Sequence, residues 1–145
     1  MTHRAETIMA TLLTKVTNLT TTSTRVSRGR AYPVDGAAMP ALTLEQGVDE
    51  VDLQNIALID RNLSFLIIAH VKTTGTTETT LNLIREEVHI ALMADRAQGL
   101  TNIVLDTMPL GDEAPDISGD SNQSVARLRM NWRIKYRHAV TNPGA

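Results

Sequence analysis

Apolar residues recur with helical spacing in two segments of the chain. The first stripe consists of Ala5, Ile8, Met9, Leu12, Leu13 and Val16, which predicts an amphipathic helix. A run of threonine and serine over residues 18–24 should end this helix, because these side chains compete for backbone hydrogen bonds. The second stripe consists of Leu81, Ile84, Val88, Ala91 and Leu92. It predicts a helix that begins near Thr77 and ends near Gly99, a glycine cap.

Residues 58–72 alternate with the period of a β-strand and carry apolar side chains on both faces. One face consists of Leu63, Phe65, Ile67, Ala69 and Val71, and the other contains Leu66 and Ile68. A strand that is apolar on both faces is typical of the middle of a sheet. We therefore expect the centre of this strand to be covered on both sides.

The clearest pattern in the chain lies in residues 124–138. Its apolar face consists of Ala126, Leu128, Met130, Trp132, Ile134 and Tyr136. Its polar face consists of Arg127, Arg129, Asn131, Arg133, Lys135 and Arg137. Strict alternation over this length predicts a long amphipathic strand with one basic face.

Shorter segments complete the expected sheet. Strands are predicted at residues 24–32, before a turn at 33–36, and at residues 40–45, where Gly47 should close the strand. A further strand is predicted at residues 101–108, with Ile103 and Leu105 alternating against polar neighbours. The acidic segments 47–55 and 109–120 are predicted to be loops, the second with few contacts, and residues 140–145 to be a flexible tail.

The order of these segments predicts a single α+β domain over residues 1–145, with a mainly antiparallel β-sheet and two principal α-helices packed on one face. A chain of 145 residues with 42% apolar and 21% charged residues can bury a globular core. The absence of cysteine excludes disulfides and thiolate chemistry and is compatible with a reducing cytosol. No signal-peptide block or membrane-length apolar segment occurs, so we expect no membrane contact.

Motifs for catalysis or cofactor binding are weak in this sequence. The histidines His3, His70, His89 and His138 lack metal-ligand spacing. The neighbouring carboxylates Glu86 and Glu87 diverge on a helix, so a solvated face explains them. The acidic run Asp112, Glu113, Asp116, Ser118 and Asp120 offers oxygen ligands but lacks the register and the closing glutamate of a calcium loop. We therefore expect no enzyme activity, no metal and no cofactor.

The basic face of residues 127–137 needs an explanation, because five cations at close spacing repel each other. One interpretation is a solvated face that meets scattered acids. A second, which we favour, pairs it with the acidic segments 45–52 or 112–120 of a neighbouring subunit. A third is a track for DNA phosphates, which the net charge of −2 and the 3% aromatic content make less favourable.

Several stretches carry a resemblance to a known family. They are the helix around residues 8–16, the motif Met39-Pro40-Ala41-Leu42-Thr43-Leu44 with Gly47, the strand end Ile67-Ile68-Ala69-His70-Val71, the run Asp95-Arg96-Ala97-Gln98-Gly99-Leu100 after the helix of residues 81–94, and the closing Met130-Asn131-Trp132-Arg133-Ile134-Lys135-Tyr136. In this order they resemble the tail terminator family of phages with long, non-contractile tails. The likeness covers most of the chain and rests on segment order more than on single motifs.

The resemblance implies a virion protein at the head-proximal end of the tail, assembled in the host cytoplasm. Such a protein forms a homo-oligomeric ring, typically a hexamer, that caps the tail tube, ends tube polymerisation and joins the tail to the head connector or a head-completion protein. DNA would pass through its lumen without sequence-specific binding. Another neck or tail-completion protein, or a small DNA-binding module using the basic strand, remains the alternative.

The charged residues that we expect at the subunit interface form three groups. The basic group consists of Arg127, Arg129, Arg133, Lys135 and Arg137. The acidic groups consist of Glu45, Asp49, Glu50 and Asp52, and of Asp112, Glu113 and Asp116.

Overall fold

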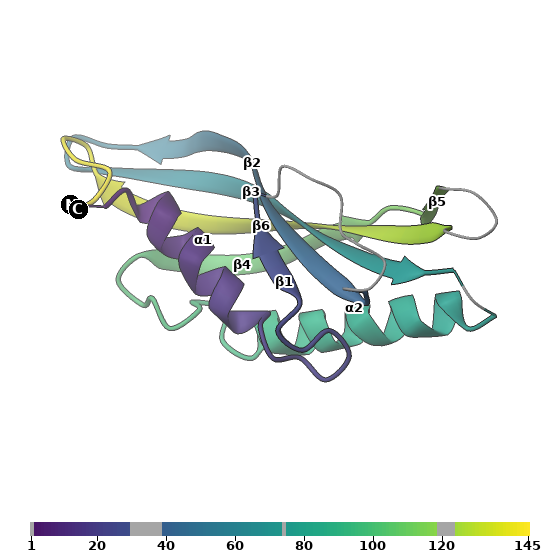
Figure 1. The fold of residues 1–145 in the computed structure, drawn as a ribbon. Helices are drawn as coiled ribbons and strands as arrows, with labels where there is room; N and C mark the ends of the chain where they lie inside the picture. The colour runs from purple at the N-terminus through teal and green to yellow at the C-terminus, as the bar shows by residue number, and fades with distance from the viewer. Residues whose placement is uncertain (1, 30–38, 74, 119–123) are drawn as a thin grey trace.

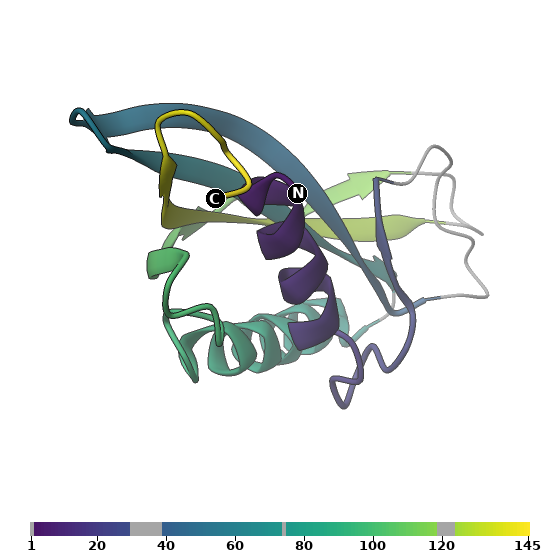
Figure 2. The same cartoon turned by 90° about the vertical axis from the view of Figure 1, so that its left-hand side faces the viewer.

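The computed structural model describes residues 2–29, 39–73, 75–118 and 124–145. A β-sheet forms one layer, and two helices form a second layer on one of its faces (Figures 1 and 2). In chain order the elements are α1 (Arg4–Lys15), β1 (Val26–Arg28), β2 (Ala41–Gln54), β3 (Leu58–Lys72), α2 (Thr77–Met93), β4 (Val104–Asp112), β5 (Asp116–Ser118) and β6 (Val125–Ala139). The turn expected at residues 33–36 lies outside the described residues.

The strands lie in the order β1-β2-β3-β6-β4, and β5 pairs with the far end of β6. The pairs among β2, β3, β6, β4 and β5 are antiparallel, whereas β1 runs parallel to β2. The predicted α+β class agrees with this architecture, but the sheet is mixed rather than purely antiparallel. β3 and β6 pair along their whole length and form the centre of the sheet.

The core lies between the helices and the face of the sheet that they cover, which we call the inner face. Both predicted helical stripes are found there. α1 contributes Ile8, Met9 and Leu12, and α2 contributes Leu81, Ile84, Val88 and Leu92, all buried. The predicted apolar faces of β3 and β6 also lie on the inner face and are buried, so the alternation in both strands is confirmed.

The opposite side of the sheet, the outer face, carries the polar side chains of β6. The centre of β3 was expected to be covered on both sides. This agrees with the burial of Ile67 on the inner face and of Ile68, 7% exposed, on the outer face. The cross-strand neighbours of Ile68 are Thr43 and Arg129. Neither α1 nor α2 lies over the outer face (Figure 1).

Residues 47–54, expected to form an acidic loop, are instead the second half of β2. They pair with the first residues of β3, so the backbone groups on that side are bonded within the sheet. Gly47 does not close the strand. A side chain at its position would meet the carbonyl oxygen of Ser64 at 3.0 Å, so glycine permits the close approach of the two strands here.

The second helix ends at Met93, six residues before Gly99. The Asp95 carboxylate accepts hydrogen bonds from the backbone N–H groups of Ala97 and Gly99, at 3.0 and 2.8 Å. This local bonding competes with helix continuation, so the turn follows directly after the helix. Gly99, with φ of +73°, lies in that turn and not at the helix end.

The strand predicted at residues 101–108 begins at Val104, and its buried positions are Val104 and Thr107 rather than Ile103 and Leu105. A register shift between Val104 and Asp106 inverts the alternation, and Leu105 is 42% exposed. The loop predicted at residues 109–120 is found only at residues 113–115, and residues 119–120 lie outside the described part of the chain. β4 extends to Asp112, and β5 pairs with β6.

Residues 140–145, expected to be a flexible tail, form a turn beside the start of α1 (Figure 1). The backbone N–H of Val140 donates to the carbonyl oxygen of Ala57 at 2.9 Å. The N–H of Arg4 donates to the carbonyl oxygen of Pro143 at 2.9 Å. These bonds join the two terminal segments to the same end of the sheet.

Candidate interaction surface

The basic side chains of β6 all lie on the outer face, because alternate residues of a strand point to opposite sides of a sheet. We call this row the basic stripe; it consists of Arg127, Arg129, Arg133, Lys135 and Arg137. Every member is partly exposed, whereas the alternating inner-face residues of β6 are buried. The sequence therefore placed this row correctly, both in position and in exposure.

Acidic residues flank the basic stripe on both sides. The strand register places Glu45 and Glu50 of β2 on the outer face, opposite Leu66 and Asn62 of β3. On the other side of β6, Asp106 lies opposite Lys135 and Asp116 lies opposite Arg127. The outer face is therefore striped with charge along the strand direction. The flanking acids weaken the field that the basic stripe could offer to a polyanion.

Arg129, Lys135 and Arg137 of the basic stripe form ion pairs with residues that the structure describes. Lys135 contacts Asp52 at 2.7 Å, and Arg129 contacts Asp116 at 3.7 Å. Arg137 donates two hydrogen bonds to the Asp60 carboxylate, at 2.6 and 3.0 Å, and these hold the pKa of Asp60 below its ordinary value. Two acids that we expected to contact the basic stripe of a neighbouring subunit, Asp52 and Asp116, thus contact the basic stripe of their own subunit. Whether they also act between subunits stays a prediction.

Other charges of the outer face have no such partner among the described residues. Arg133 contacts the sulfur of Met108, with 3.0 Å between Nη2 and Sδ, and forms no ion pair with any residue the structure describes. Glu45 and Glu50 are exposed and likewise form no ion pair within the described part of the chain. The outer face therefore retains charge of both signs that another surface can meet.

Two of the expected interface acids lie on the inner side instead. The Tyr136 hydroxyl donates a hydrogen bond of 2.5 Å to Asp49, whose carboxylate is also 3.9 Å from Arg61. Burial of the phenol, followed by this hydrogen bond, raises the pKa of Tyr136. Asp112 forms an ion pair of 2.7 Å with Arg85 of α2. For Glu113, which follows Asp112, the described contact is through the backbone: its N–H donates to the Arg129 carbonyl oxygen at 2.9 Å.

A projecting hairpin, residues 47–57, occupies the segment predicted to be an outward acidic loop, but its strand pairing and exposed apolar side chains were not predicted. It joins β2 to β3 and extends past both helices (Figure 2). Four large apolar side chains on it are exposed: Val48 by 61%, Val51 by 50%, Leu53 by 64% and Ile56 by 99%. The sequence could have indicated these exposed apolar side chains, because four large apolar residues occur in a segment that is too acidic to be buried.

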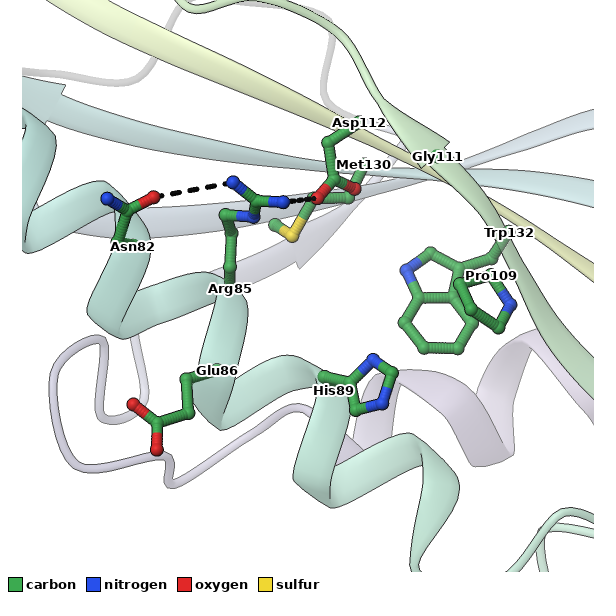
Figure 3. A pocket seen from close by; sticks show the side chains of 9 residues that line it. All are labelled: Asn82, Arg85, Glu86, His89, Pro109, Gly111, Asp112, Met130 and Trp132. Carbon is green, nitrogen blue, oxygen red and sulfur yellow. Dashed lines mark hydrogen bonds and ion pairs between the residues drawn. The ribbon is translucent and has the colours of Figure 1, made fainter.

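A groove of about 440 Å³ separates α2 from β4 (Figure 3). Met130 and Trp132 lie at its sheet side, and Arg85 and His89 reach into it from the helix. Arg85 is held by Asp112, and the His89 ring lies 5.8 Å from the Trp132 ring. Arg85 is therefore committed to Asp112, whereas Glu86 and His89 form no hydrogen bond or ion pair with another described residue.

The histidines and the suggested calcium ligands have local structural contacts. His70 contacts the Thr43 hydroxyl at 3.0 Å, and His138 Nε2 accepts a hydrogen bond from Arg61 at 2.8 Å. Asp112 and Asp116 pair with arginines, and Asp120 lies outside the described residues. Within the described ranges no group of three or more metal-ligating side chains occurs. No described helix is long and apolar enough to cross a membrane.

Comparisons with known proteins find a likeness among solved structures but none at the level of sequence families. No protein-family model matches the chain, and no curated protein sequence matches it. Among solved structures, a chain from the virion of a native gene transfer agent particle is similar over 93% of this chain and 88% of its own length. The sequence identity is 13% and the TM-score is 0.45.

Proposed function

We propose that this chain is a structural virion protein of the tail terminator type, which forms a ring on the tail tube and ends its polymerisation. The observation that carries this proposal is the outer face. It runs the length of β3 and β6, neither helix lies over it, and it carries stripes of opposite charge with Arg133, Glu45 and Glu50 left without ion partners among the described residues. Such a face suits contact with another protein surface more than contact with a small molecule.

A closed ring requires two different patches on each subunit, which contact each other between neighbours. The outer face and the projecting hairpin supply two such patches on one chain. The function would consist of binding alone. The ring covers the growing end of the tube, so no further tube subunit finds its complementary surface. Its opposite side would receive the head connector or a head-completion protein, with DNA passing through the lumen.

The sequence left two alternatives to a tail terminator, and the structure favours them unequally. Another neck or tail-completion protein would use the same kind of surfaces, and the tube experiment below separates it from a terminator. A DNA-binding module is less favoured, because Asp106, Asp116 and Glu50 flank the basic stripe and would repel phosphates. That alternative predicts DNA binding that weakens steeply with added salt.

The experiment that tests the proposal adds the purified chain to polymerising tail tube protein and measures tube length by electron microscopy. We expect shorter tubes, each with a ring at one end, at substoichiometric amounts of the chain. Light scattering on the same preparation gives the mass of the ring. Tubes of unchanged length without rings would contradict the terminator function.

A matched variant links this activity to the outer face. Arg129→Glu with Arg133→Glu reverses two charges of the basic stripe and should weaken ring formation while the chain stays folded. The control is Arg85→Glu, which reverses a charge on α2, away from the outer face. Equal ring formation by the double variant and the unaltered chain would remove the basic stripe from the interface.

A further inference from the structure

We propose that, within this ring, the projecting hairpin of one copy docks on the basic stripe of the next copy. This inference rests on the proposed function, since it names the contact that closes the ring. It also assigns a role to the apolar side chains of the hairpin, which neither the fold nor the charge pattern explains.

The hairpin carries apolar surface that its own chain does not cover. Val48, Val51, Leu53 and Ile56 lie within nine residues of one another, and all are at least half exposed. The helices cover the first residues of β2, but neither helix lies beneath the hairpin (Figure 2). Exposed apolar residues scattered singly are ordinary on protein surfaces, but four of them within one short projecting element are typical of a contact site.

Charge selects the surface that can receive this hairpin. The projecting hairpin contains three carboxylates, Asp49, Glu50 and Asp52, and neither lysine nor arginine. Two hairpins packed against each other would bring like charges together, which disfavours a symmetric hairpin pair. The receiving surface should therefore be a different and basic one, so that the contact is heterologous.

The groove between α2 and β4 fails this requirement. Glu86 and Asp112 line it, and the hollow that continues it toward β5 adds Glu78 and Glu113, against the single cation Arg85. Arg85 is moreover already paired with Asp112. An acidic hairpin would meet repulsion there.

The basic stripe meets the requirement. β6 carries five cations and no carboxylate. Arg133 near its middle forms no ion pair with the described residues and lies beside Met108, with half-buried Leu66 one strand away. The aliphatic part of an arginine covers apolar surface while its head stays available for a carboxylate. Glu50 of the arriving hairpin supplies such a carboxylate, and its neighbours supply the apolar contact.

Cysteine crosslinking tests the contact directly, because the chain contains no cysteine of its own. One preparation carries Leu53→Cys and the other carries Asn131→Cys, which adjoins Arg133 on the outer face. We expect an intermolecular disulfide when the two are mixed and little in either alone. The control mixture of Leu53→Cys with Leu110→Cys, an exposed position of β4, should stay uncrosslinked. A disulfide confined to Leu53→Cys alone, or equal in both mixtures, would overturn the proposed contact.

Substitutions then measure its strength by the concentration at which rings dissociate. Leu53→Ser with Ile56→Ser should raise the dissociation constant on the order of 30-fold, as loss of interface anchors does. The control, Leu110→Ser with Ile117→Ser, removes two other exposed apolar residues, outside the hairpin, and should leave it unchanged. Glu50→Lys and Arg133→Glu should each weaken the ring, and their combination should restore it. Failure of the combined reversal to restore assembly would overturn the charge pairing.

The outcomes separate this inference from the proposed function. Rings that form and shorten tubes regardless of the hairpin substitutions would refute the hairpin contact and leave the terminator function in place. Tubes of unchanged length, with the mixed disulfide still formed, would refute the terminator function and retain the contact between copies.

Discussion

The two halves of β2 share one strand partner and differ in almost everything else. Residues 41–44 are buried, whereas residues 45–54 are nearly all exposed although the antiparallel pairing with β3 continues. The first half lies between β1 and β3 with core residues against it, and the second half has only β3 beside it. Backbone pairing thus makes the strand, and packing by a second layer decides which of its side chains the fold needs. Apolar residues of the second half are available for a partner.

The largest expected difference between the two halves is in stability. Leu44→Ala removes a fully buried side chain and should lower the free energy of unfolding by about 2–5 kcal/mol. Leu53→Ala, in the exposed half, should change it by less than about 0.5 kcal/mol. Urea denaturation followed by circular dichroism measures both. Similar losses for the two variants would show that the hairpin packs against the body in solution.

A smaller effect is expected at the junction of the two halves, where Tyr136 binds Asp49. Tyr136→Phe removes a hydrogen bond to a charged group and should cost about 1.5–3 kcal/mol of unfolding free energy. Asp49→Asn is the matched variant, because it keeps the size of the acceptor and removes its charge. If Tyr136→Phe unfolds at the same urea concentration as the unaltered chain, this bond does not hold the hairpin.

Tyr136 should also make the stability of the fold depend on pH in the alkaline range. Burial and Asp49 raise the pKa of Tyr136 above its ordinary value of 10.0, so the folded state favours the protonated phenol. The resulting stability is fully present below pH 10 and is lost as the pH rises above it. We expect the phenolate absorbance of Tyr136 to appear only as the chain unfolds. Ionisation of both tyrosines at pH 10 with the fold intact would contradict this.

The smallest expected effect lies at Asp60, on the outer face near the base of the hairpin. The hydrogen bonds from Arg137 lower the pKa of Asp60, so the stability that they give is present above the ordinary value of 3.8 and is lost as the pH falls below it. Arg137→Met should therefore flatten the loss of stability between pH 4 and pH 2. Thermal unfolding over that range measures the slope, and an unchanged slope would show that other acids control it.

The elements predicted best from the sequence are those with one strong pattern and one buried face. The stripe around Leu12 and the alternation around Trp132 both survive in the structure, because burial of one face fixes them. Leu105 was assigned to the wrong face because a bulge shifted the register by one residue, and the sequence carries no clear sign of it. The end of the second helix was predicted too late, at Gly99, because the Asp95 side chain forms the turn directly after Met93.

The candidate surface was predicted in part for a similar reason. The basic stripe follows from alternation alone, but its partners depend on register between strands far apart in sequence. Asp52 reaches Lys135 across β3, a pairing that no local pattern indicates. A register shift between Gln46 and Asp49 reverses the parity of β2, so that Asp49 faces inward and Glu50 outward. The exposed apolar residues of the hairpin have no periodic signature because neither of its faces is buried.

The central place of β6 in the sheet also bears on the order of events during synthesis. β3, β4 and β5 all pair with β6, yet β6 follows every one of them along the chain. At roughly 5–20 residues per second, β3 leaves the ribosome several seconds before β6 does. The core cannot close until then, so a truncated chain would expose unpaired strands. The basic stripe lies on β6, so the proposed contact surface between copies forms only when β6 completes the sheet.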